Sequence, residues 1–217
     1  MMVSPSNPDS LPRPIRFAAI TCLVLAALTG WAAISEATEL AHFFESRSRR
    51  MEAGSPMLLG NDPADFQRLL EAQYQALEPM REPRALLMGV LAIACAVVFV
   101  SAGRILKPHG MPRERIRMLL GRAAIAVAVL RTIDGAQWAV VARRTSNAVS
   151  QILIKRPEYQ DPATAEMVST VTQAMSLGLT VAGTALIAGT FALLGQFFRS
   201  DSVREALVTR DSPAADP

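Results

Sequence analysis

The chain has 217 residues, of which 51% are hydrophobic, and carries a formal net charge of +3 at pH 7. This apolar content is high for a water-soluble protein of such length. The basic residues gather at the ends of the apolar stretches, which fits the orientation of membrane spans better than binding to nucleic acid. We therefore predict an all-α integral membrane protein that binds no nucleic acid.

Residues 1–12 are rich in Ser, Pro and Asn, and we expect them to form a disordered cytoplasmic tail. The first apolar stretch follows directly, after Arg13 and Arg16. A cleaved signal peptide is the alternative for this stretch. However, its apolar run exceeds the usual signal core of about 7–15 residues, which favours a retained membrane anchor.

Four apolar stretches are long enough to cross a membrane as helices, because a helix needs about 20 residues to span roughly 30 Å of hydrocarbon. They lie at about 17–35, 85–103, 120–142 and 174–198. We predict that these spans form one antiparallel four-helix domain, residues 13–200, with helical extensions outside the membrane.

The outer segments, 36–84 and 143–172, are predicted to be helical. An Asp-Pro pair opens a helix in each, at Asp62 and Asp161, since Asp caps a helix and Pro suits its first position. Apolar residues then recur at helical spacing. In the first segment these are Phe66, Leu69, Leu70, Tyr74 and Leu77.

No strong helix breaker lies between about residues 16 and 52 or between 113 and 155. The first and third spans should therefore continue as helices about 55 and 65 Å long that project from the membrane. Similar short motifs recur between the two halves at an offset of about 94–99 residues, so duplication of a helical hairpin stays open.

The connection between the second and third spans, with the start of the third, is the most basic part of the chain. Its basic residues are Arg104, Lys107, Arg113, Arg115, Arg117 and Arg122. Short basic loops remain in the cytoplasm, so we expect loop 104–119 and both termini there. The basic stretch should lie against anionic lipid headgroups, with docking of a cytoplasmic protein as the alternative. Arginine and alanine richness with scarce lysine hints at a bacterial plasma membrane.

Arg131 and Asp134 fall within the third span, where each charge costs about 2.5–3.5 kcal/mol at mid-depth. Their spacing lets them pair on one helix face. We expect Arg131 to point towards the fourth span, and no further acid or base within the other spans. The leading interpretation is a buried pair that fixes bundle register. The alternatives are a polar pathway for an ion and a contact with a charge on another membrane protein. The expected hydrogen-bond partners of Arg131 are Thr180, Thr184 and Thr190.

Small residues form strips at helical spacing in the last two spans, and such strips allow close backbone approach in lipid. The fourth span carries Gly178, Ala182, Ala185, Gly189 and Ala192, and the third carries Gly121, Ala124, Ala128, Arg131, Gly135, Trp138 and Ala142. We predict that the two strips pack together at a left-handed crossing near 20°. A homodimer seam is the alternative.

Residues 201–217 are predicted to be a largely disordered cytoplasmic tail, in which "SVREAL" adds a short amphipathic turn. Cys22 and Cys95 lie within spans and should be buried thiols. Glu39, His42 and Glu45 have a metal-ligand spacing, but no second such motif accompanies them, so we expect a solvated helix face.

The sequence lacks the short motifs of the common nucleophilic, metal-dependent and phosphate-binding enzymes. We therefore predict no catalytic residues, no metal and no cofactor. The favoured function is an assembly or interaction subunit that contacts another copy or another membrane protein. A small transporter or channel subunit using Arg131 and Asp134 is the alternative. A membrane sensor comes third, because no cytoplasmic output domain follows the spans.

Overall fold

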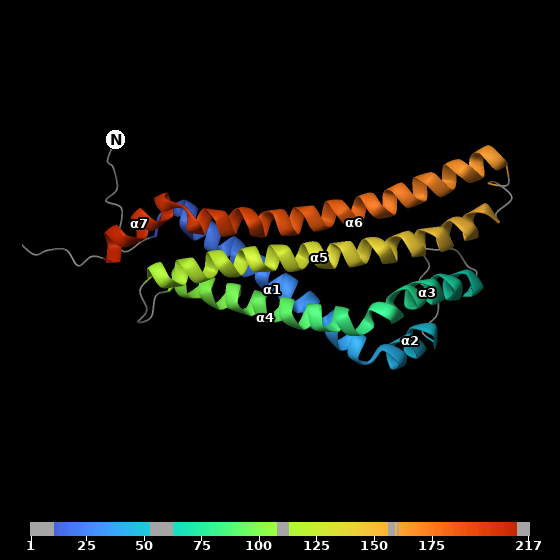
Figure 1. The fold of residues 1–217 in the computed structure, drawn as a ribbon, viewed down its shortest axis with the longest axis horizontal. Coiled ribbons are helices and arrows are strands. Elements are labelled where there is room, and N and C mark those ends of the chain that lie inside the picture. Colours follow the sequence, from blue (N-terminus) through green and yellow to red (C-terminus); the bar gives the residue numbers. More distant parts are fainter. Residues whose placement is uncertain (1–10, 53–62, 108–112, 156–158, 160, 212–217) are drawn as a thin grey trace, which may run out of the picture. The chain divides into compact units, whose positions relative to one another are not determined.

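A computed structural model describes residues 11–52, 63–107, 113–155, 159 and 161–211, and the secondary structure of these residues is helical (Figure 1). This confirms the predicted all-α fold class. The helices are α1 (Arg13–Ala41), α2 (Phe43–Glu52), α3 (Pro63–Leu77), the short 3-10 helix η2 (Glu78–Met80), α4 (Arg81–Leu106), α5 (Arg113–Ile154), α6 (Pro162–Arg199) and α7 (Asp201–Asp211).

The helix starts follow from local chemistry. Helix α6 begins at Pro162, and the Asp161 carboxylate accepts a hydrogen bond from the backbone N–H of Thr164 at 3.2 Å. This confirms the predicted cap, which satisfies one of the free N–H groups at the helix start. Helix α3 begins at Pro63 as expected, while its predicted cap, Asp62, lies outside the described residues.

The two long helices expected from the absence of helix breakers are present with one difference. Helix α5 runs unbroken for 42 residues, which corresponds to about 63 Å. The helix predicted to run from 16 to 52 is instead divided into α1 and α2 at His42. The interruption is a single residue, since the backbone N–H of His42 still donates to the Thr38 carbonyl oxygen at 3.1 Å and that of Ser46 donates to the His42 carbonyl oxygen at 2.8 Å.

Three helices are long and apolar enough to cross a membrane: Arg13–Ala41, Ala64–Leu106 and Pro162–Arg199. They contain the first, second and fourth predicted spans. The third predicted span, 120–142, lies on α5, which is the least apolar of the four long helices. Arg131 and Asp134 in its centre contribute to that difference.

By their contacts the residues divide into two compact units, and α1, α4, α5 and α6 each contribute to both. The first unit comprises Met1–Ala32, Leu91–Val129 and Gly189–Pro217, and the second comprises Ala33–Val90 and Leu130–Ala188.

The core of the first unit combines small and aliphatic side chains with two buried phenylalanines, Phe191 and Phe198. Cys22 and Cys95 are buried free thiols, and Gly30 allows α1 to approach α4, since a Cβ there would lie 3.1 Å from the Cβ of Cys95. Helix α7 extends to Asp211 and buries Val203 and Leu207. It is therefore longer than the short turn predicted after the fourth span, because these two side chains anchor it.

Glycines mark where α5 and α6 approach closely. In the first unit, a Cβ on Gly195 would lie 2.9 Å from the carbonyl oxygen of Gly121. In the second unit, a Cβ on Gly135 would lie 2.8 Å from the Cβ of Thr184. An added Cβ would overlap the facing helix at both points, so Gly195 of α6 and Gly135 of α5 permit the close approach of the two helices.

The strip predicted on α6 does not supply the matching surface within the chain. A Cβ on Gly178 or Gly189 would meet open space, and Ala182 and Ala185 are exposed. Helix α6 instead turns a different face inward, on which residues also recur at intervals of three and four. That face carries Thr184, Ala188, Phe191 and Gly195. Helices α5 and α6 therefore do pack together at glycines of the predicted α5 strip, but α6 uses another of its faces, because small residues occur on more than one side of it.

The second unit includes a core formed where α2 and α3 meet α1 and α5. Its buried members are Leu40, Phe43, Leu70, Tyr74, Ala76, Leu77 and Val141. The rings of Phe43 and Tyr74 pack edge to face with centroids 5.2 Å apart, a favoured aromatic geometry. The periodicity that predicted α3 thus identified residues that are buried in this core.

Candidate functional site

A buried arginine on α4 is the centre of a polar cluster in the second unit. The Arg84 side chain is 0% exposed, and each of its three nitrogens donates a hydrogen bond. Its Nε donates to Glu36 at 2.6 Å, its Nη1 to Gln137 at 3.1 Å and its Nη2 to Asp134 at 2.7 Å. One guanidinium therefore joins α1, α4 and α5.

Asp134 is shared between two arginines. Its carboxylate is 1% exposed, with Oδ1 accepting from Arg84 and Oδ2 accepting from Nη1 of Arg131 one turn earlier on α5. The structure therefore brings Arg131 and Asp134 together and adds Arg84 and Glu36. With two arginines and two carboxylates the cluster is neutral when all four are ionised, as buried charges require.

The aromatic ring of Trp138 covers the cluster on one side. The Arg84 guanidinium carbon lies 4.8 Å from the centroid of this ring, which is within the range of a cation–π interaction. Trp138 was placed on the small-residue strip of α5 by the sequence. Its ring here shields the cationic centre from solvent.

Arg131 is less completely satisfied than Arg84. Its Nε is buried without a hydrogen-bond partner, while its Nη1 bonds Asp134. Thr180, one of its expected partners, instead donates to the carbonyl of Ser176 at 2.8 Å, and Thr184 packs against Gly135. The side chain of Arg131 therefore pairs along α5 with Asp134.

Sequence reasoning missed Arg84 and Glu36 because both lie one residue beyond the predicted spans, at 85 and 35. They were therefore counted with the outer segments. A signal did exist in the sequence. Glu36 directly follows the first apolar stretch and Arg84 directly precedes the second, so both lie at the same end of two neighbouring antiparallel spans.

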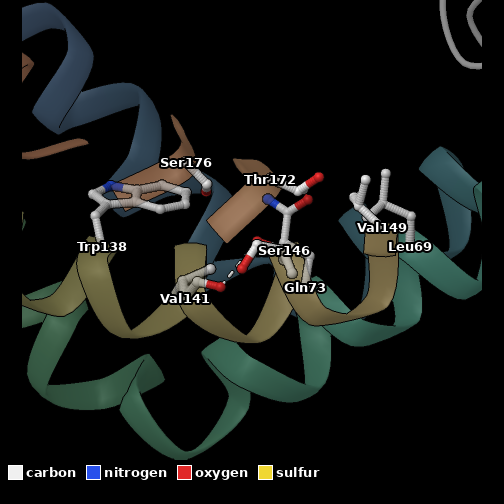
Figure 2. A pocket seen from close by; sticks show the side chains of 9 residues that line it. Leu69, Gln73, Trp138, Val141, Ser146, Val149, Thr172 and Ser176 are labelled. Carbon is white, nitrogen blue, oxygen red and sulfur yellow. Dashed lines mark hydrogen bonds between the residues drawn. The ribbon is translucent and has the colours of Figure 1, made fainter. Parts of the chain in front are cut away.

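A cavity of about 310 Å³ adjoins the cluster in the second unit (Figure 2). It is lined by Leu69 and Gln73 of α3, by Trp138, Val141, Thr145, Ser146 and Val149 of α5, and by Thr172 and Ser176 of α6. Figure 2 shows Trp138 at one end of the cavity and Leu69 with Val149 at the other. Trp138 therefore borders both the cavity and the charged cluster.

The cavity wall is mainly apolar with a few hydroxyl and amide groups, and its lining residues include no acid, base or thiol. Several of its hydroxyls are already used by the backbone of α5: Thr145 donates to Val141 at 3.0 Å, Ser146 to Arg143 at 2.9 Å and Ser176 to Ala142 at 3.4 Å. The chemistry of this lining suits hydrogen bonding to an uncharged group rather than proton transfer or nucleophilic attack.

The predicted basic loop divides into two kinds of residue in the first unit. Arg104, Lys107, Arg115 and Arg122 are exposed and Arg113 is partly exposed, as a membrane-surface role requires. Arg117 is instead buried and donates to the carbonyl oxygens of Phe198 at 2.6 Å and Ser200 at 3.2 Å. Its assignment to the lipid-facing set was therefore wrong, because its guanidinium is buried against the carbonyl oxygens of Phe198 in the last turn of α6 and of Ser200 just beyond it.

The same arginine also binds Glu114. Its Nε and Nη2 donate to the two carboxylate oxygens at 2.9 and 2.7 Å. This hydrogen bonding holds the pKa of Glu114 below its ordinary value, with a smaller contribution from the nearby charge. The pair ties the start of α5 to the end of α6.

The possible metal-ligand residues of α1 and α2 have other partners. Glu39 pairs with Arg50 at 2.7 Å, and Glu45 pairs with Arg49 at 3.1 Å. No group of three potential metal ligands occurs within the ranges that the structure describes.

No protein-family model matches the chain, and comparisons with curated proteins and with solved structures also give no match.

Proposed function

We propose that the chain is a four-span integral membrane protein that acts as an assembly or interaction subunit, with α5 as the third span of an antiparallel bundle. The apolar character of α1, α4 and α6 supports a membrane location. The neutral cluster supports α5 as a membrane span, because the carboxylate of Asp134 accepts hydrogen bonds from two guanidinium groups and is thereby shielded from lipid.

The length of α4 supports a position for the cluster near the outer membrane boundary. Arg84 precedes Arg104 by 20 residues of one helix, which is about 30 Å and equals the thickness of the hydrocarbon core. With Arg104 at the cytoplasmic surface, Arg84 reaches the opposite one. At that depth Arg84, Glu36 and Asp134 fix the register of three helices at a smaller cost than at mid-membrane.

The observation that carries the interaction role is an uncovered apolar row on α6. Thr184 lies level with Gly135, beside Asp134, so residues well before Thr184 on α6 lie outside the membrane in this arrangement. Met167 there is 67% exposed and Val171 is exposed as well, and Met175, at the outer edge of the predicted fourth span, is 61% exposed on the same side. Exposed apolar rows in water are typical of protein interfaces, and methionine adapts well to a partner surface.

This assignment makes the partner an apolar helix on another membrane-associated protein or a second copy of the chain. A photo-reactive residue at Val171 should form an adduct in intact membranes. The same group at Glu166, about 140° away around α6, is the control and should form much less. Substituting Met167→Gln and Met175→Gln should abolish copurification at unchanged abundance. Migration of the chain alone in mild detergent, with no adduct from Val171, would contradict the role.

A second candidate function is a small transport or channel subunit. The observation that favours it is the cavity beside Trp138, which brings hydroxyl groups next to the charged cluster. Against it, both carboxylate oxygens of Asp134 already accept from arginines. Flux through reconstituted vesicles that falls with Arg131→Gln at normal protein abundance would favour transport over assembly.

A further inference from the structure

The first unit contains an apolar groove between α4 and α5 that ends at two arginines. The groove has a volume of about 440 Å³, within the range of about 300–1,000 Å³ that is usual for small-molecule sites. Its residues are Ile93, Ala96, Val97, Val100, Ser101 and Arg104 of α4, and Arg115, Ile116 and Leu119 of α5.

Along α4 the lining of the groove changes from apolar side chains to a basic one. Ile93, Ala96, Val97 and Val100 share one helix face because they are three or four residues apart, and Arg104 follows on that face one turn later. Ile93 is 68% exposed, so the apolar wall is open along its side. The groove therefore presents hydrocarbon along its length and positive charge at one end.

The dimensions of the groove match one leaflet of a membrane. Eleven residues separate Ile93 from Arg104, which corresponds to about 16 Å along α4. Half of a hydrocarbon core roughly 30 Å thick is about 15 Å. A fatty acyl chain that lies along this wall would thus bring its headgroup to the level of the two guanidinium groups.

We propose that this groove binds one anionic phospholipid, with an acyl chain against the apolar wall and the headgroup phosphate between Arg104 and Arg115. The inference rests on the proposed membrane location, which places these arginines at the cytoplasmic surface. Guanidinium groups suit phosphate because their planar N–H donors match its oxygens. Basic pockets between spanning helices on the cytoplasmic side are a known mode of anionic lipid recognition. A free phosphate ion would leave the apolar wall empty.

The test compares lipid retention by the full-length chain in zwitterionic detergent, measured by native mass spectrometry. The probes are phosphatidylglycerol and phosphatidylcholine with identical acyl chains. We expect one phosphatidylglycerol to be retained per chain and phosphatidylcholine to be lost. Each arginine near a headgroup contributes about 1 kcal/mol, so the Arg104→Gln/Arg115→Gln variant should bind phosphatidylglycerol about 30-fold more weakly.

Two further variants separate the groove from general surface charge. Lys107→Gln/Arg122→Gln removes the same charge outside the groove and should leave retention nearly unchanged. Ala96→Phe fills the apolar wall without changing charge and should weaken retention. Equal losses in the two charge variants, equal retention of both lipids, or displacement of phosphatidylglycerol by inorganic phosphate would overturn the proposal.

These outcomes are distinguishable from failure of the proposed function. Lipid retention in micelles depends on α4 and the start of α5 and does not depend on whether α5 crosses the membrane or whether α6 contacts a partner. A chain that stays soluble and monomeric without detergent would instead remove the membrane location itself.

Discussion

Removing the charge of Arg84 should destabilise the protein more than any other single change to the cluster. The variant Arg84→Met removes three hydrogen bonds and leaves two carboxylates facing one arginine. Deleting one partner of a buried ion pair costs about 3–5 kcal/mol, because the remaining charge is uncompensated. We expect a decrease of this size in the free energy of unfolding.

Two comparisons isolate the electrostatic cause. Arg81→Met, one turn earlier on α4, removes an arginine that is one-third exposed and lies 3.9 Å from Glu82. This control should cost about 1 kcal/mol or less. The double variant Glu36→Met/Arg84→Met restores neutrality and should recover more than half of the loss, since Asp134 keeps its bond to Arg131.

The assay is unfolding in mixed micelles of increasing sodium dodecyl sulfate content, followed by tryptophan fluorescence in a Trp31→Phe background. Trp138 then reports directly, because its ring lies against Arg84. If Arg84→Met costs no more than Arg81→Met, or if the double variant is less stable than Arg84→Met, the cluster is not the buried neutral unit described here.

Two further predictions concern packing and pH. Gly135→Ala should lower the thermal midpoint by an amount equivalent to about 1–3 kcal/mol, because the new Cβ would overlap Thr184. The control Gly178→Ala should be neutral or slightly stabilising, because its added methyl group meets open space. Unchanged stability of Gly135→Ala would contradict the close helix approach. The pKa of Glu114 is lower in the folded chain than its ordinary value of 4.5, so its bond to Arg117 should stabilise the fold fully above that pH and progressively less as the pH falls through the folded value. In thermal melts between about pH 3 and 7, Glu114→Gln should therefore differ from the wild type most at the upper end, and a difference that grows on acidification would refute this assignment.

Much of the helical framework could be predicted because its signals are local. The Asp161 cap, the Pro starts of α3 and α6, and the unbroken α5 follow from residues adjacent in the chain. The one-residue division at His42 was missed because no glycine, proline or other helix breaker marks it in the sequence.

The site was harder to predict because it depends on which helices meet. Arg131 and Asp134 are close in sequence, so their pairing was accessible. Arg84 is 50 residues from Asp134, and only the packing of α4 against α5 brings them together. Its place at the edge of an apolar stretch made it look like an ordinary flanking charge.

The face that α6 turns inward was also undetermined by sequence. Its small residues surround the helix, so spacing alone did not distinguish the exposed side with Gly178 from the packed side with Gly195. Arg117 shows the same limit, since its partners are backbone carbonyls near Phe198, which no pattern of side chains reveals.

The central claim is that α5 crosses the membrane, and cysteine accessibility tests it most directly. Single cysteines at Arg115 and Asn147, both exposed positions near opposite ends of α5, are introduced in a Cys22→Ala/Cys95→Ala background. An impermeant maleimide applied to intact bacterial cells with a permeable outer membrane should label Asn147→Cys directly, and Arg115→Cys only after the inner membrane is opened. Labelling of both positions from the same side would contradict the account, as expected if only α1, α4 and α6 span the bilayer.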